Sequence, residues 1–94
     1  MPAVARLGDA NVTHCSGMVQ AEGSGNVFAN GIPISLKGHH NTGHKLHGSP
    51  CPGHTAPISS GSKKVFINSK ECGRSGDPTC TSIAAGSPNV FVGG

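Results

Sequence analysis

Ninety-four residues with a formal net charge of +3 predict one small domain covering residues 1–94. Only 34% of the residues are hydrophobic, and 15 glycines and seven prolines argue against long helices. The Lys and Arg residues are scattered, with Lys63-Lys64 the only adjacent pair, and the aromatic residues are three Phe, so no nucleic-acid partner is expected. Order with so thin a core usually needs a metal, disulfides or a partner.

No apolar run approaches the ~20 residues of a membrane-spanning helix. The first residues lead straight into Arg6 and Asp9, and no secretory signal is expected there. We therefore expect a protein made in the cytoplasm without a signal peptide. That compartment favours metal-binding thiolates over disulfides. The four cysteines stand beside six histidines, which also points to a metal.

A nine-residue pattern around a Val-Phe pair occurs three times, at 23–31, 61–69 and 86–94. Each copy begins with Gly-Ser, which predicts a turn, and its Val-Phe pair is typical of a short strand. In the first copy, Asn30-Gly31 predicts a tight hairpin that returns through residues 32–36. Adjacent side chains point to opposite faces of a strand, so one face can close the core while the other needs a covering partner.

A second element follows the first two copies, at 35–39 and 73–77. The third copy ends the sequence, while the matching segment 5–9 stands near the N-terminus. We therefore expect an all-β ring of three units around one axis, in which the N- and C-terminal segments complete one repeat together.

These residues resemble the PAAR-repeat proteins, whose unit is Gly-Ser-x-x-Val-Phe-x-Asn-Gly-x-Pro followed by Arg-x-Gly-Asp. The matches cover 23–39, 61–77, and 86–94 joined to 5–9. The resemblance implies a cone-shaped three-repeat β domain with quasi-threefold symmetry. Three departures are His39 in the position of the Asp, Lys37-Gly38 without the usual Arg, and Ser69-Lys70-Glu71 in place of Gly-x-Pro.

The resemblance also implies a function, in type VI secretion systems or contractile phage tails. The chain would be a structural zinc-binding tip that caps and sharpens a homotrimeric β-helical spike, at one tip per trimer. It would be incorporated into the injection apparatus or virion tail and contact the target cell envelope transiently. No small-molecule substrate is implied. The apolar pairs are expected near the base and against the spike: Val27, Phe28, Val65, Phe66, Val90 and Phe91.

Histidines and cysteines gather in three intervals, 9–23, 39–61 and 77–86. If three units surround an axis, these intervals are loops that converge at one end. His14, His54 and Cys80 are then expected to be equivalent zinc ligands. A closed structural zinc site takes four N or S ligands, and the long middle interval can supply the fourth. The family's three histidines and one cysteine favour His47 for that position, with His44 as the alternative.

A local metal site is a competing hypothesis. The spacing of His44, His47, Cys51 and His54 would form a compact knuckle without His14 or Cys80. His39 and His40 are expected to be bystanders, and Cys15 and Cys72 to be small buried apolar groups.

Enzymatic activity is not expected. His40 and His44 are four residues apart, as in helical zinc proteases, but residues 38–44 are poor helix formers and contain no glutamate to act as general base. Two alternative functions are a free-standing zinc-binding adaptor for protein or nucleic acid, and a small zinc hydrolase with an open metal position.

Overall fold

The computed structural model describes residues 2–12, 17–42 and 55–93. In these ranges the regular secondary structure consists of short strands, and no helix occurs, which confirms the all-β expectation. The described residues contain no helix long and apolar enough to cross a membrane. The strands, each of two residues, are β1 (Phe28–Ala29), β2 (Ile32–Pro33), β3 (Phe66–Ile67) and β4 (Lys70–Glu71).

The four strands form two antiparallel hairpins, β1–β2 and β3–β4. In the first turn, Asn30 and Gly31 have φ angles of 58° and 75°. In the second turn, Asn68 and Ser69 have φ angles of 53° and 66°. Two successive residues with positive φ are typical of a type I′ turn, whose twist matches that of the flanking strands. The first hairpin is therefore the one predicted from Asn30-Gly31, and the second keeps this geometry without a glycine.

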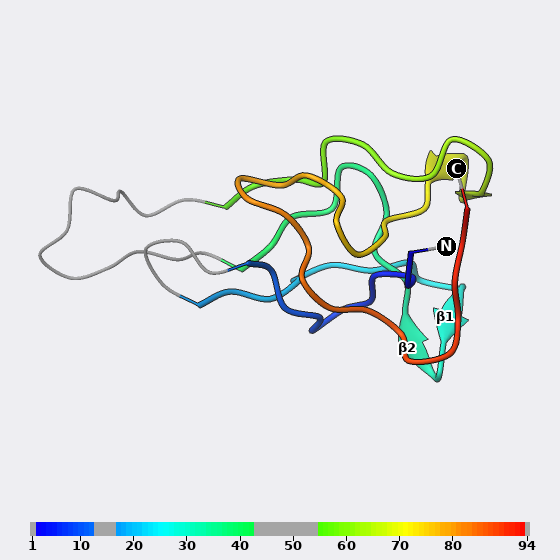
Figure 1. Ribbon diagram of the computed structural model, residues 1–94. Coiled ribbons are helices and arrows are strands. Elements are labelled where there is room, and N and C mark those ends of the chain that lie inside the picture. Colours follow the sequence, from blue (N-terminus) through cyan, green and yellow to red (C-terminus); the bar gives the residue numbers. More distant parts are fainter. Residues whose placement is uncertain (1, 13–16, 43–54, 94) are drawn as a thin grey trace, which may run out of the picture.

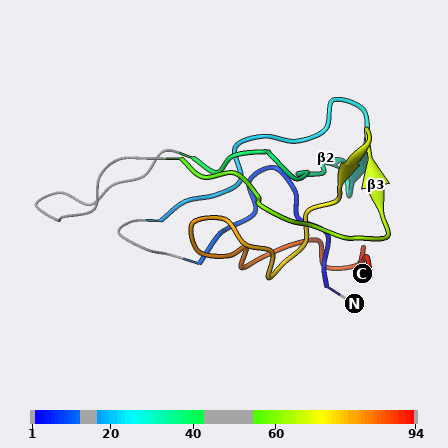
Figure 2. The same cartoon turned by 90° about the horizontal axis from the view of Figure 1, so that it is seen from above.

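The two ends of the chain pair with each other. The Val4 amide donates to the Val90 carbonyl at 2.9 Å, and the Val92 amide donates to the Pro2 carbonyl at 3.0 Å. Figures 1 and 2 show both ends of the chain at the same end of the molecule as the hairpins. Residues separated by almost the whole sequence therefore lie side by side.

Three distant segments are joined in a closed cycle of backbone hydrogen bonds. The Ser35 amide donates to the Ala5 carbonyl at 2.9 Å, and the Gly73 amide donates to the Ser35 carbonyl at 2.9 Å. The Ala5 amide donates to the Gly73 carbonyl at 3.0 Å and closes the cycle. Two small groups of buried side chains accompany it, namely Val4, Ala29, Ile34, Leu36 and Cys72, and Ala5, Ile58 and Ile83. The core is small, as the composition indicated.

The Gly-Ser dipeptide at the start of each copy has a defined structural role. The hydroxyls of Ser24, Ser62 and Ser87 each accept the amides of the residues two and three positions later, at 2.9–3.2 Å. The glycine lets the backbone pass close to a neighbouring segment, because a Cβ on Gly61 would collide with the Cys72 carbonyl oxygen. The repeated dipeptide thus sets the path of the chain into each Val-Phe pair.

Candidate functional site

Three exposed Phe side chains form the first candidate surface. Phe28, Phe66 and Phe91 are 53%, 58% and 48% exposed. The preceding valines point the other way and pack against the buried core cluster; they are Val27, Val65 and Val90. Each Val-Phe pair therefore has one side chain in the core and one on the surface, as strand geometry predicted. The role of these six residues in binding a partner stays a prediction.

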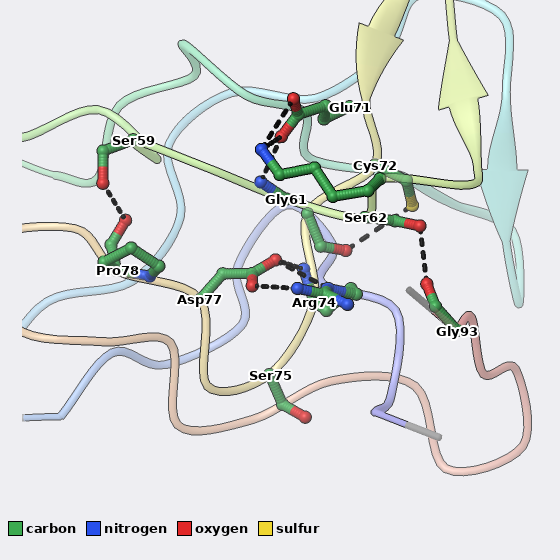
Figure 3. A network of polar contacts seen from close by, with 12 residues as sticks. Ser59, Gly61, Ser62, Glu71, Cys72, Arg74, Ser75, Asp77, Pro78 and Gly93 are labelled. Carbon is green, nitrogen blue, oxygen red and sulfur yellow. Dashed lines mark hydrogen bonds and ion pairs between the residues drawn. The ribbon is translucent and has the colours of Figure 1, made fainter.

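Hydrogen bonds fix the three Val-Phe copies relative to one another. The serine of the Gly-Ser dipeptide in each copy bonds to a group from a different copy. These bonds join Ser24 Oγ to Asn68 Oδ1 (2.7 Å), Ser87 Oγ to Asn30 Oδ1 (2.5 Å), and Ser62 Oγ to the Gly93 carbonyl (2.6 Å). Figure 3 shows the last of them. The exposed Phe residues are consequently mounted on a connected framework and not on independent hairpins.

Two of the three second elements are closed by an Arg–Asp ion pair. Arg6 Nε lies 3.0 Å from Asp9 Oδ2, and Arg74 Nη2 lies 2.8 Å from Asp77 Oδ1 (Figure 3). Each carboxylate also accepts the backbone amide of its own arginine, at 2.8 and 2.7 Å. The hydrogen bond to the aspartate raises the pKa of both arginines. In each of these turns the positive charge is therefore paired with a negative charge.

His39 takes the place of the aspartate in the remaining second element. The backbone amide of Leu36 donates to His39 Nδ1 at 3.0 Å. This nitrogen must therefore be unprotonated, and burial lowers the pKa of His39. His39, expected to be a bystander, therefore has a structural role in this turn that was not predicted. The signal was its alignment with Asp9 and Asp77 in the repeat.

His40 is held by a carboxylate. Glu22 Oε2 accepts the backbone amide of His40 at 2.6 Å and lies 2.9 Å from its Nδ1. The backbone hydrogen bond and the imidazole contact lower the pKa of Glu22. Both groups are about half exposed, so the pair is a surface interaction that contributes little net stability.

Of the predicted zinc ligands, Cys80 alone lies within the described residues. His14, His47 and His54 lie outside them, as do His44 and Cys51 of the alternatives and Cys15. Cys80 is exposed, and the Asn41 side-chain amide donates to its sulfur at 3.7 Å. An exposed thiol that accepts an amide N–H fits a thiolate ligand. Across 2–12, 17–42 and 55–93, no three His, Cys, Asp or Glu side chains come together as a metal site.

A buried polar cluster lies beside Cys80. Asn11 Oδ1 accepts from Asn41 Nδ2 at 3.2 Å and from Thr79 Oγ1 at 2.9 Å, while Asn11 Nδ2 donates to Gln20 Oε1 at 2.9 Å. Asn11 and Asn41 each stand shortly before a range outside the described residues, and Thr79 directly precedes Cys80. One residue from each of the three histidine- and cysteine-bearing intervals therefore takes part in this cluster. In Figure 1 the described segments on either side of residues 13–16 and 43–54 lie away from the end that carries the hairpins.

Cys72 is the other cysteine in the described ranges. It is fully buried in the core cluster, and burial raises the pKa of its thiol to about 11. A neutral, buried thiol packs as a small apolar side chain, which confirms the expectation for this residue.

The comparisons with known proteins place the chain in no family. No protein-family model matches it, and no curated protein matches it.

Proposed function

We propose that this chain is the zinc-bound structural tip of a trimeric spike in a contractile injection system. The fold we propose is a cone-shaped β domain with three units around one axis and quasi-threefold symmetry. In this arrangement the N-terminal segment and the C-terminal copy form one unit together. The tip would be carried by a secretion apparatus or phage tail, and it would contact the target envelope only during injection.

The observation that carries the proposal is the repetition of the same hydrogen bonds in three parts of the chain. The closed cycle of Ala5, Ser35 and Gly73 is one instance. In a second instance the backbone amide of the serine in each copy donates to a backbone carbonyl at 2.7–2.9 Å. These bonds run from Ser24 to Ile34, from Ser62 to Cys72 and from Ser87 to Val4. A single chain with three similar units can present matching surfaces to three identical subunits, and this suits a cap on a homotrimer.

The three exposed Phe residues support a seat for such a trimer. They come from the three copies and lie on strands or bridges joined by side-chain hydrogen bonds. Exposed aromatic side chains on a rigid support are typical anchors of protein interfaces. We therefore assign Phe28, Phe66 and Phe91 to the base of the tip, with the paired valines behind them in the core.

A zinc ion would stiffen the opposite end. The residues that would hold it are His14, His54 and Cys80, with His47 as the fourth ligand and His44 as its alternative. Cys80 lies beside the polar cluster in which residues of all three intervals meet, and this position supports the assignment. A structural zinc ion is worth an apparent ~10–16 kcal/mol in finger peptides, which is as large as the whole stability of many domains.

Four protein ligands would leave the zinc no open position for a water nucleophile, so the tip would have no hydrolase activity. In place of chemistry, the ion would fix three Gly- and Pro-rich loops in one geometry. Metal binding would then contribute directly to the stability of the folded chain.

The decisive experiment mixes the purified chain with the spike trimer of the same apparatus and measures the mass of the complex by light scattering. We expect one tip per three spike chains. A variant with serine at all three exposed Phe positions (F28S, F66S, F91S) should fold and lose the complex, because the apolar anchors are gone. Failure of the wild-type chain to bind, or another ratio, would contradict the proposal. A salt-dependent shift of DNA would instead favour an adaptor.

A further inference from the structure

The positive charge of this protein is concentrated on one of the three Val-Phe copies. The copies at 23–31 and 86–94 contain no charged residue. Residues 61–71 contain three lysines and one glutamate, a formal charge of 3 − 1 = +2. Lys37 lies 3.8 Å from that glutamate and brings the local charge to +3, which equals the formal net charge of the whole chain. We call this group the basic hairpin: β3, β4, and the lysines at positions 37, 63, 64 and 70.

The remaining described charges largely cancel. Both arginines lie in ion pairs with the aspartate three residues later, and Glu22 is in contact with His40. Lys45 lies outside the described residues. The basic hairpin is therefore the place in the described structure where positive charge exceeds negative charge.

Glu71 organises this charge without removing it. Its Oε1 accepts the Gly61 amide at 2.8 Å and its two oxygens lie 3.2 and 3.1 Å from Lys63 Nζ. The Gly61 hydrogen bond and the Lys63 contact lower the pKa of Glu71, which keeps the carboxylate charged. Lys64 and Lys70 are exposed and form no ion pair with any described residue, so their charge is available to a partner.

The basic hairpin lies beside one of the exposed apolar anchors. Phe66, on β3, is the most exposed of the three Phe residues, and Lys64 and Lys70 flank it on the same hairpin. Aromatic anchors surrounded by charged residues are typical of interfaces in which apolar contact sets the lifetime and charge sets the association rate. The first and third copies offer the apolar contact without the charge.

We propose that the basic hairpin docks against an acidic surface of the trimeric spike, next to the position that receives Phe66. This inference depends on the proposed function and adds the chemistry of the partner's surface to it. A homotrimer presents each acidic surface three times, while the tip carries a single basic hairpin. The basic hairpin therefore makes the first contact with any one of three equivalent subunits, and the other two Phe residues follow.

An acidic protein surface fits these observations better than an anionic membrane. The exposed Phe residues are fixed in one connected framework, which matches three defined positions on a protein more closely than a fluid lipid surface. Binding to vesicles is accordingly an outcome that the test includes.

The test measures association and dissociation rates of the tip with the spike trimer between about 50 and 500 mM salt. For the wild type we expect the association rate to fall about tenfold or more across this range, because steering by charge is screened. The variant K63Q/K64Q/K70Q should associate slowly at low salt, with a flat salt dependence and a dissociation rate within about twofold of wild type. Poly-glutamate should inhibit binding of the wild type to the trimer and should not inhibit binding of the triple variant.

A charge-transfer variant supplies the matched control. Gly25 occupies the position of Lys63 in the first copy, is exposed, and has free space for a side chain. Adding G25K to the triple variant should recover part of the association rate, because a threefold partner offers the same acidic surface to every copy. No such recovery is expected if the acidic surface is not repeated.

The outcomes separate the two proposals. If the trimer binds but wild-type association is independent of salt, or unchanged in K63Q/K64Q/K70Q, the acidic docking surface is wrong and the tip function stands. If the wild-type chain does not bind the trimer, the proposed function fails and this inference fails with it. Lysine-dependent binding to phosphatidylserine vesicles, with salt-independent binding to the trimer, would replace the acidic protein by a membrane.

Discussion

Ser69 shows how a single residue carries backbone strain in this fold. Its φ of 66° lies in the left-handed region, which costs a residue with a Cβ about 1–2 kcal/mol relative to glycine. The equivalent residue of the first hairpin is Gly31, with a φ of 75°. The second hairpin therefore holds the same turn at a higher conformational cost.

We predict that S69G raises the free energy of unfolding by up to about 1 kcal/mol, because relief of the strain exceeds the extra entropy that glycine gives the unfolded chain. The matched control is G31S in the first hairpin, which should lower it by a similar amount. Urea titration of both variants beside the wild type measures the two changes. A destabilising S69G would show that the Ser69 side chain contributes more than the turn geometry indicates.

His39 is the second residue whose local chemistry leads to a prediction. Its Nδ1 accepts the Leu36 amide, and burial, Lys70 and His40 all lower its pKa while Glu22 raises it. The folded state therefore binds fewer protons at this site than the unfolded state does.

The stabilising contribution of His39 is fully present above its unfolded pKa of about 6.5. It is lost as the pH falls through the lower folded pKa. We expect H39D, which restores the aspartate found at positions 9 and 77, to remove this loss. Unfolding free energies of wild type and H39D, compared from about pH 8 to pH 5, isolate the effect from the other histidines. Identical pH profiles would contradict the assigned hydrogen bond.

At the scale of the elements, local sequence patterns predicted the turns and the side-chain directions, which are set by residues adjacent in the chain. Asn30-Gly31 predicted the first hairpin, and strand alternation predicted that each valine and its neighbouring Phe face opposite ways. The strands are only two residues long, however, and the sheet-like order comes from single bridges between distant segments. Such bridges depend on how the chain closes, which no local pattern contains.

The candidate site was likewise predictable from the sequence only in part. Sequence reasoning singled out Cys80 and the exposed Phe residues, because their residue types signal metal binding and contact surfaces. It missed the polar cluster of Asn11, Gln20 and Asn41, since asparagine and glutamine carry no pattern that signals burial. The basic hairpin was not predicted either, because Lys70 and Lys37 join the adjacent Lys63-Lys64 pair only when β3 pairs with β4 and Lys37 approaches Glu71.

The Ser turns allow a prediction at the element scale. Ser62 is fully buried, and its hydroxyl accepts the Lys64 and Val65 amides and donates to the Gly93 carbonyl. We expect S62A to lower the free energy of unfolding by about 1–3 kcal/mol, because buried polar groups are left unsatisfied. S59A is the control: Ser59 is exposed, with one 3.3 Å bond, and should change stability by less than about 0.5 kcal/mol. Equal effects would show that the turn bonds contribute little.

At the scale of the whole molecule, the apolar core is small, and polar side chains occupy much of the interior. The largest fully buried side chains include Gln20, Asn41, Ser35 and Ser62 beside Leu36. Buried polar groups specify a unique arrangement when they are satisfied, but they add little net stability. A chain held in this way needs a further source of free energy, and the proposed zinc ion is one with the required magnitude.

The last prediction separates the two possible metal sites. If three loops converge on one ion, H14A and C80S should each lose zinc in elemental analysis, while C51S should keep it. In that arrangement His14 and Cys80 are zinc ligands from the first and third intervals, and Cys51 is not a ligand. The local knuckle predicts the reverse, with zinc lost in C51S and retained in H14A and C80S. H40A, whose imidazole is held by Glu22, serves as the control and should keep zinc.

Stability should follow the metal in the same experiment. A variant that loses zinc should unfold at much lower temperature or denaturant than the wild type, because the binding free energy is part of the folding free energy. Chelation of the wild type should reproduce that shift, and should leave the metal-free variants unchanged. A zinc-free chain as stable as the wild type would mean that the polar network holds the fold by itself, and the proposed apex would then have no mechanical reason to bind an ion.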